Sequence, residues 1–202
     1  MSVLRYKNDQ AEVHSVIVGP LDTNVYVLRC RNTGKAVLLD AADDAPKLVD
    51  MARSLGVDRV LETHGHGDHI AAVPGVREAG LPVGISPADA HYLDGHDFDL
   101  VDDEIIEVGD LRLRTVFTPG HTMGSTSFVL EGDPLWLFAG DTLFPGGPGT
   151  ARHGGDFPTI IESIRERLFT LPDDTVVMPG HGKDTTIGTE RPHLQEWIDR
   201  GW

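Results

Sequence analysis

Four side chains that commonly bind metal ions lie within six consecutive positions of this sequence. Residues 61–72 read LETHGHGDHIAA, in which His64, His66, Asp68 and His69 form the pattern H-x-H-x-D-H. With ten His and 22 Asp among 202 residues, about 0.003 occurrences of this pattern are expected per chain by chance. Chance is therefore a poor explanation, and the cluster indicates a metal site.

The local structure expected around this cluster directs its ligands toward two points. Residues 59–63 have the composition of a β-strand, in which residues i and i+2 point to the same side, so His64 and His66 face one point. The glycines between the ligands let the backbone turn, so that Asp68 and His69 face a second point. A helix is expected at the start of HIAAV with Asp68 as its N-cap. The alternative is that Asp68 is only a cap and the histidines are polar loop residues.

Three further ligand-type residues each follow an apolar, strand-like run and a glycine. His121 lies in TVFTPGHTMGS, Asp141 in LWLFAGDTLF and His181 in VVMPGHG. Each of these signals is weak alone, because His or Asp at the end of a strand is usually a turn residue. Together with the first cluster they give five histidines and two aspartates at the ends of four strands, which predicts a two-metal site at one edge of a pair of sheets.

The composition limits the partners that are expected. Acidic residues outnumber basic ones by 32 to 17, the net charge is −15 and there is no basic run, so nucleic acid is not an expected partner. No apolar run approaches the roughly 18 residues of a membrane span, and the N-terminus has no apolar segment, so we expect a cytoplasmic protein without membrane contact. A single cysteine, Cys30, excludes an intrachain disulfide and a cysteine-based metal cage.

The length suits one domain, and the pattern of elements predicts a layered α/β sandwich with mixed sheets. A turn is expected at Gly109-Asp110, and the acidic stretch 94–103 is expected to be a solvated loop. Helices are predicted over 45–56, 157–171 and 191–202. Strands are predicted over 14–19, 24–30, 35–42, 59–64, 81–86, 103–120 in two parts, 125–132, 134–141 and 174–182.

The motifs THGHGDH, TPGHTMGS, GDTLF and PGHG occur here in an order and at spacings that resemble the metallo-β-lactamase superfamily, and within it the glyoxalase II-like (hydroxyacylglutathione hydrolase-like) branch. The resemblance covers almost the whole chain. It implies a single domain over residues 1–202, folded as a four-layer αβ/βα sandwich of two mixed β-sheets. The implied first metal site is His64, His66 and His121, and the second is Asp68, His69 and His181. Asp141 would bridge the two ions, and Asp40 would orient the site from behind the ligands.

The resemblance also implies a reaction. Two divalent ions, zinc first with iron or manganese as alternatives, would share a hydroxide that attacks a carbonyl carbon. Asp68 and Asp141, supported by Asp40, would then be catalytic. A small acyl-thioester suits this site, because a thiolate leaves readily without a dedicated acid. The enzymes of the superfamily that open β-lactams most often carry Cys or Ser where this chain has Asp141, which argues against an antibiotic-degrading role.

Two departures from the glyoxalase II pattern concern the substrate. No C-terminal helical domain is expected to bind glutathione, because the chain ends about twenty residues after His181. The loop after Asp141 reads GPGTARHGGDF where relatives often have Gly-Arg-Thr-Asp. Candidate substrate contacts, each of which is alternatively an ordinary surface or packing residue, are Arg152, His153, Lys183 and Phe144.

Two alternatives to a thioester hydrolase stay open at this point. Persulfide dioxygenases of the superfamily bind one iron with residues that match His64, His121 and Asp141. A non-catalytic protein that keeps metals for stability is the other alternative, but a closed structural site does not need seven ligands. The sequence does not determine the acyl group, the thiol carrier, the native metal or the oligomeric state.

Overall fold

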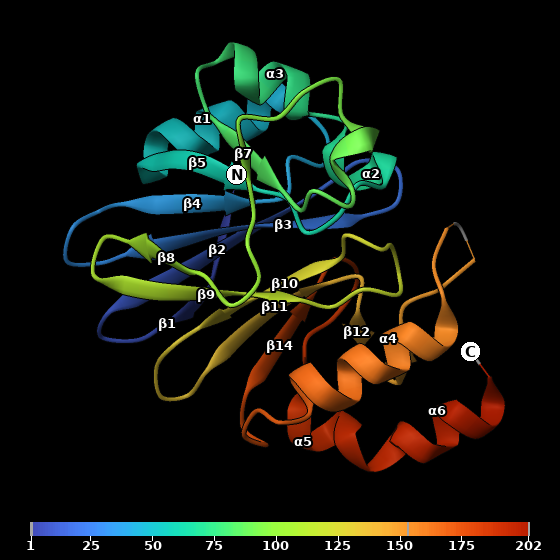
Figure 1. Ribbon diagram of the computed structural model, residues 1–202. Helices are drawn as coiled ribbons and strands as arrows, with labels where there is room; N and C mark the ends of the chain where they lie inside the picture. The colour runs from blue at the N-terminus through green and yellow to red at the C-terminus, as the bar shows by residue number, and fades with distance from the viewer. Residues whose placement is uncertain (1, 153, 202) are drawn as a thin grey trace.

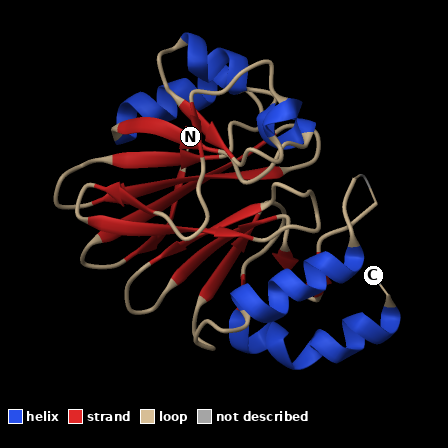
Figure 2. Ribbon diagram, viewed as in Figure 1, coloured by secondary structure: helices blue, strands red, loops and turns tan. Residues whose placement is uncertain are grey.

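Two β-sheets pack face to face, and helices cover the outer face of each (Figure 1). The computed structural model describes residues 2–152 and 154–201. Figure 2 shows the resulting four layers, with helices above and below the paired sheets. This arrangement confirms the predicted four-layer αβ/βα sandwich of mixed sheets. No helix among the described residues is both long enough and apolar enough to cross a membrane.

The first sheet is antiparallel from β1 to β4 and parallel from β4 to β7. Its outer face is covered by α1 (Ala45–Leu55), α2 (Gly67–Ile70) and α3 (Val73–Glu78) (Figure 1). In spatial order its strands are β1 (Val3–Lys7), β2 (Ala11–Val18), β3 (Thr23–Cys30), β4 (Ala36–Leu39), β5 (Val57–Leu61), β6 (Val83–Ile85) and β7 (Phe98–Asp99).

The second sheet is antiparallel except where β11 and β14 run parallel. In spatial order its strands are β15 (Thr185–Thr186), β14 (Val176–Pro179), β11 (Trp136–Gly140), β10 (Thr126–Leu130), β9 (Leu111–Phe117) and β8 (Ile105–Val108). A short hairpin, β12 (Leu143–Phe144) and β13 (Gly147–Pro148), follows β11. The helical segments on this side are α4 (Phe157–Ser163), the π-helical turn η2 (Ile164–Leu168), α5 (Ile187–Glu190), η3 (Arg191–His193) and α6 (Leu194–Arg200).

The apolar residues form one buried layer between the sheets and one beneath each group of helices. Phe128 and Phe138 belong to the layer between the sheets, Leu48 of α1 and Val60 of β5 to the layer on the first sheet, and Trp197 of α6 to the layer on the second sheet. Every residue of β10 and of β11 is buried, because each central strand has the partner sheet on one face and helices on the other. These layers fix the sheet edge at which the strand-end residues meet.

The structure differs from the sequence-based expectation in several segments. Strand β1 and helix α3 were not predicted, because neither has a clear period in sequence. The acidic stretch contains the edge strand β7, since Asp97 accepts a hydrogen bond from Val83 N–H and pairs with Arg77. The prediction that Asp68 is an N-cap is wrong. His66 occupies that position, and the Asp68 carboxylate turns toward His181.

Candidate metal centre

The seven predicted ligands meet at one edge of the sandwich, where strands of both sheets end. The loops after β5, β9, β11 and β14 supply them, as the strand-end pattern predicted. Three groups of side chains bring their ligand atoms within 4.8 Å of one another: His64 with His66 and His121, Asp68 with His69 and His181, and His64 with His69 and Asp141. Segments far apart in sequence thus form two adjacent half-sites.

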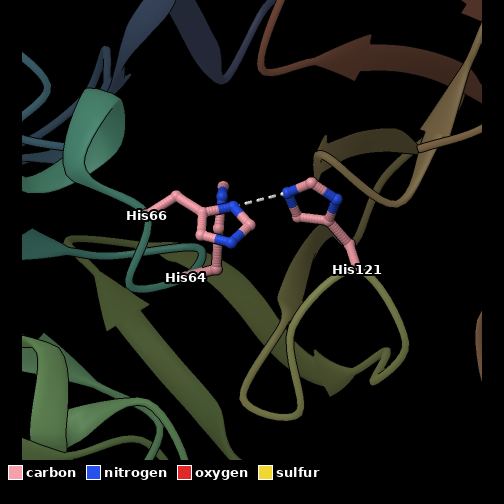
Figure 3. Close-up of side chains that lie close together, drawn as sticks. All are labelled: His64, His66 and His121. Atoms are coloured by element: carbon pink, nitrogen blue, oxygen red, sulfur yellow. Dashed lines mark hydrogen bonds between the residues drawn. The ribbon is translucent and has the colours of Figure 1, made fainter. Parts of the chain in front are cut away.

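The first half-site consists of three histidines from two loops. Figure 3 shows the imidazoles of His64, His66 and His121 turned toward one another. His66 Nδ1 lies 2.8 Å from His121 Nε2. The ring centroid of His64 lies 4.9 Å from that of His66 and 4.8 Å from that of His121. All three rings therefore converge on one point.

The second half-site combines a carboxylate with two histidines. His181 Nε2 lies 3.2 Å from Asp68 Oδ2 and 3.2 Å from His69 Nε2. The third side of this triangle, from His69 Nε2 to Asp68 Oδ2, is 3.7 Å. The three ligand atoms face a common centre, separate from that of the first half-site.

Asp141 lies between the two half-sites. Its Oδ2 is 3.5 Å from His121 Nε2 in the first half-site and 3.5 Å from His181 Nε2 in the second. Its Oδ1 is 3.5 Å from His69 Nε2. This is the position that a carboxylate bridging two ions would occupy.

The spacing of these atoms suits divalent metal ions. Two ligands about 2.0–2.1 Å from a tetrahedral ion lie about 3.3 Å apart, close to the separations of 2.8 to 3.7 Å found here. Among the described residues, His64 Nε2 and Asp141 Oδ1 are buried polar atoms without a hydrogen-bond partner. Buried polar atoms are rarely left unpaired, so these two indicate a ligand at the centre.

Four of the histidines have their outer ring nitrogen fixed by the protein. His121 Nδ1 lies 2.6 Å from the Thr150 carbonyl, and His181 Nδ1 lies 3.0 Å from the Leu21 carbonyl. A carbonyl can only accept, so each Nδ1 donates, and Nε2 is the ring nitrogen left to face a metal. His64 Nδ1 lies 3.0 Å from Thr63 Oγ1, and His69 Nδ1 lies 2.8 Å from Asp40 Oδ2.

Asp40 lies behind the ligands, as expected. Its buried carboxylate accepts hydrogen bonds from Thr63 N–H at 2.6 Å, from Thr63 Oγ1 at 2.9 Å and from His69. Beside it is Glu62, which sequence reasoning missed although it is the one charged residue in the run VLETH. Glu62 is fully buried, and burial together with the charge of Asp40 raises its pKa well above its usual range. A second buried carboxyl, which accepts a hydrogen bond from Ala41 N–H at 3.1 Å, therefore lies beside Asp40 in the interior.

The carboxylates give the site a negative potential. A hydrogen bond from His181 lowers the pKa of Asp68 to about 2, so this group is ionised at neutral pH. Burial lowers the pKa of His69, but Asp40, Asp141 and Asp68 outweigh it and raise the value to about 9. Burial and the neighbouring histidines hold the pKa of His64 well below its usual range. The carboxylates thus draw a proton onto His69, a charge that bound cations would replace.

The glycines of the first motif act differently from the expectation. Neither Gly65 nor Gly67 has a positive φ, so neither is required for an unusual turn. A Cβ at position 65 would lie 2.2 Å from the ring of Tyr92, whereas one at position 67 would meet nothing within 4 Å. Gly65 is needed for close packing, and Gly67 has no such constraint.

An open pocket of about 360 Å³ gives access to the centre. It is lined by Leu21, His66, Gly67, Asp68, His121, Asp141, Thr150 and His181. A second cavity of about 800 Å³ adjoins it, because Thr150 lines both. Leu21 and Thr150 were not predicted as site residues, and no local pattern marks them.

The structure separates the predicted substrate contacts. The ring of Phe144 stacks on that of His181, with centroids 6.5 Å apart. Arg152 lines the second cavity. Lys183 is exposed and lines neither of the two cavities, and His153 lies outside the described residues. Tyr92, which was not predicted, stands beside His66 with ring centroids 6.3 Å apart.

Comparisons with known proteins agree with this geometry. The family model described as the metallo-beta-lactamase superfamily matches residues 18–181. "Probable metallo-hydrolase YqgX" of Bacillus subtilis is 32% identical over 204 residues, covering 86% of this chain and 92% of that protein. A hydroxyacylglutathione hydrolase of Polaromonas is 35% identical over 160 residues, covering 77% of this chain but 60% of that protein.

Two solved structures share the fold at similar identity. The BLEG-1 B3 metallo-beta-lactamase has a TM-score of 0.81 and 31% identity, covering 90% of this chain and 97% of that chain. ETHE1 from Myxococcus xanthus has a TM-score of 0.79 and 30% identity, covering 90% of this chain and 82% of that chain. A protein named as a metallo-beta-lactamase and one named ETHE1 thus share this architecture.

Proposed function

Because the chain belongs to the metallo-beta-lactamase superfamily, we propose that it is a metal-dependent hydrolase with a dinuclear site and that it cleaves a small acyl-thioester. The observation that carries this proposal is the position of Asp141, within 3.5 Å of ligand atoms in both half-sites. One carboxylate shared in this way suits two ions better than one.

Each half-site would hold one divalent ion, with Asp141 as the shared ligand. Bound there, such ions would supply a hydroxide at neutral pH and would polarise the carbonyl of the substrate. The donors are nitrogen and oxygen without sulfur, which suits zinc and also iron or manganese. Asp68, ionised because its pKa is about 2, acts only as an acceptor, and Asp40 keeps the Nε2 lone pair of His69 directed at the centre.

The lining of the pocket favours a thioester. Among the described residues that line it, every ionisable one is also a proposed metal ligand, so none is left to protonate a leaving group. A departing amine or alkoxide needs such a proton far more than a departing thiolate does. The reason is that a thiol has a pKa of only about 8.5, so its thiolate is a stable leaving group. The name of the Polaromonas relative, a hydroxyacylglutathione hydrolase, supports the same class of substrate.

The surroundings suggest how a substrate would bind. Leu21, 61% exposed, and the ring of Phe144 offer apolar contacts beside the centre. Arg152 in the adjoining cavity would contact a negatively charged group of the acyl or thiol portion. No hydrogen bond or ion pair engages Arg152 within the described part of the chain, so its guanidinium is available.

A thiol-release assay tests the proposal. The purified chain, loaded in turn with zinc, iron or manganese, is given acyl-thioesters of glutathione, coenzyme A and a small neutral thiol. We expect thiol release that His69→Ala abolishes and that His14→Ala, a histidine outside the centre, leaves unchanged. Failure with every metal and every thioester would overturn the proposal.

Metal content and two other substrates separate the alternatives. We expect two ions per chain in protein with full activity. One iron per chain, with oxygen consumption in the presence of a persulfide, would indicate the dioxygenase instead. A β-lactam is included among the substrates because the fold is similar to that of the BLEG-1 metallo-beta-lactamase. Turnover of the β-lactam and of no thioester would indicate a β-lactamase instead.

A further inference from the structure

Asp89 is a buried carboxylate, 1% exposed, that does not belong to the seven-ligand set. We infer that it is a positioning residue that sets the geometry of the three-histidine half-site by joining the two loops that carry its ligands. The inference rests on the proposed metal binding and adds to it a residue that touches none of the ligand side chains in the described contacts.

The contacts of Asp89 reach both loops. Its Oδ2 accepts hydrogen bonds from Gly65 N–H at 2.8 Å and from Thr122 Oγ1 at 2.6 Å. Its Oδ1 accepts a hydrogen bond from Gly124 N–H at 2.8 Å. Gly65 separates His64 from His66, and Thr122 directly follows His121. One carboxylate therefore binds next to all three histidines.

The two loops need such a connection because they belong to different sheets. His64 and His66 follow β5 of the first sheet, whereas His121 lies between β9 and β10 of the second. Strand pairing fixes positions within a sheet but not between two sheets. A backbone hydrogen bond from Thr126 N–H to the Thr63 carbonyl, at 2.7 Å, also crosses between the sheets here. Asp89 adds charge-assisted hydrogen bonds to residues that directly neighbour the three histidines in sequence.

The packing around Asp89 leaves it little freedom to move. A Cβ at position 124 would lie 2.5 Å from Asp89 Cγ, so only glycine allows this approach. Thr122 and Ser125 close their own loop, because Ser125 Oγ accepts from Thr122 N–H at 2.9 Å. On the other side Tyr92, one turn further along the chain, covers Gly65. The carboxylate thus joins two segments that are each already ordered.

Zinc affinity of the isolated half-sites tests the inference. The Asp68→Ala variant keeps only the three-histidine half-site intact. The His66→Ala variant keeps only the second half-site, that of Asp68, His69 and His181, intact. Competition with a chromophoric zinc chelator measures each affinity in the full chain. We expect Asp89→Ala to weaken binding about 10- to 100-fold in the Asp68→Ala background and by less than about threefold in the His66→Ala background.

Two milder variants keep the test decisive if Asp89→Ala does not fold. Thr122→Val removes one of the three contacts, and Asp89→Asn removes the charge, and both should weaken zinc binding only in the Asp68→Ala background. Asp97→Asn is the control, because Asp97 also accepts a hydrogen bond from a backbone N–H, that of Val83, but among the described residues it has no hydrogen bond or ion pair with the seven candidate ligands or their loops, and it should change neither affinity.

The outcomes distinguish this inference from the proposed function. Equal losses in both backgrounds would show a general structural role and overturn the inference, as would unchanged affinity in both. Zinc binding is read without turnover, so a failed thioesterase assay would leave this result standing. If neither half-site of the unaltered Asp89 protein binds zinc, the proposed function fails first.

Discussion

His66 Nδ1 lies 2.8 Å from His121 Nε2, although the two residues are 55 positions apart and belong to loops of different sheets. Without a metal, one of these nitrogens must carry a proton and donate a hydrogen bond to the other. With a metal, both lone pairs would face the ion. The chain therefore holds the two rings close together before any ion binds, which lowers the reorganisation that metal binding requires.

Metal removal should lower the stability of the fold. A ligand that binds only the folded state stabilises it by about 2.7 kcal/mol when its free concentration is 100 times its Kd. We therefore expect a clear fall in Tm after chelation and its recovery on adding zinc, measured by calorimetry. His66→Ala should reduce the recovery, whereas His14→Ala should preserve it. A Tm independent of zinc would contradict metal binding at this centre.

Asp40→Asn should weaken the second half-site selectively. Asp40 orients His69 through a 2.8 Å contact, and loss of such a partner typically costs about 10- to 100-fold in metal affinity. Chelator competition in the His66→Ala background measures this loss. The first half-site, measured in the Asp68→Ala background, should lose less. An equal loss in both would mean that Asp40 acts on the fold as a whole.

Arg152→Gln should raise KM for a thioester that carries a carboxylate. The expected increase is roughly tenfold, because a hydrogen bond to a charged group contributes about 1.5 kcal/mol. A neutral thioester should show no such change. Lys183→Gln is the matched control, since Lys183 is exposed and lines neither the metal pocket nor the cavity beside it. If the two substitutions act alike, Arg152 has no specific contact with the substrate.

Gly149→Ala should damage the centre, whereas Gly67→Ala should be tolerated. A Cβ at position 149 would lie 1.9 Å from the backbone oxygen of Asp141 and 3.3 Å from His121 Nδ1, so the loop must shift. A Cβ at position 67 meets nothing within 4 Å. Metal content and thiol release of the two variants provide the comparison. Full metal content in Gly149→Ala would show that this loop adapts.

The ion pair between Asp102 and Arg167 should make stability depend on pH. Burial raises the pKa of Asp102, but hydrogen bonds from Arg167 and Phe117 N–H outweigh it and hold the pKa below its usual range. A lowered folded-state pKa stabilises the fold above the unfolded value of about 3.9, and this contribution is lost as the pH falls through the folded pKa.

Urea unfolding of metal-free protein checks this pH dependence. Asp102→Asn should be less stable than the unaltered chain at pH 7, and the difference should shrink below about pH 4. A constant difference across this range would show that the effect does not come from the charge of Asp102.

The sequence by itself determined the candidate ligands and the strand ends that carry them. His64, His66, Asp68 and His69 form a local pattern, and His121, Asp141 and His181 each follow an apolar strand and a glycine. Such signals depend on strand periodicity and ligand chemistry, which short stretches of sequence contain. The layered sandwich followed from the same alternation of strands and helices.

Only the tertiary structure revealed the residues that hold the ligands in place. Asp89 bonds to Gly65 and Thr122, which are 24 and 33 positions away, and the Leu21 carbonyl orients His181 from 160 positions away. Glu62 gains its role from burial beside Asp40. These contacts depend on how two sheets pack against each other, and no local pattern records that packing. The candidate ligands could therefore be predicted from the sequence, whereas the residues that support them could be identified only from the tertiary structure.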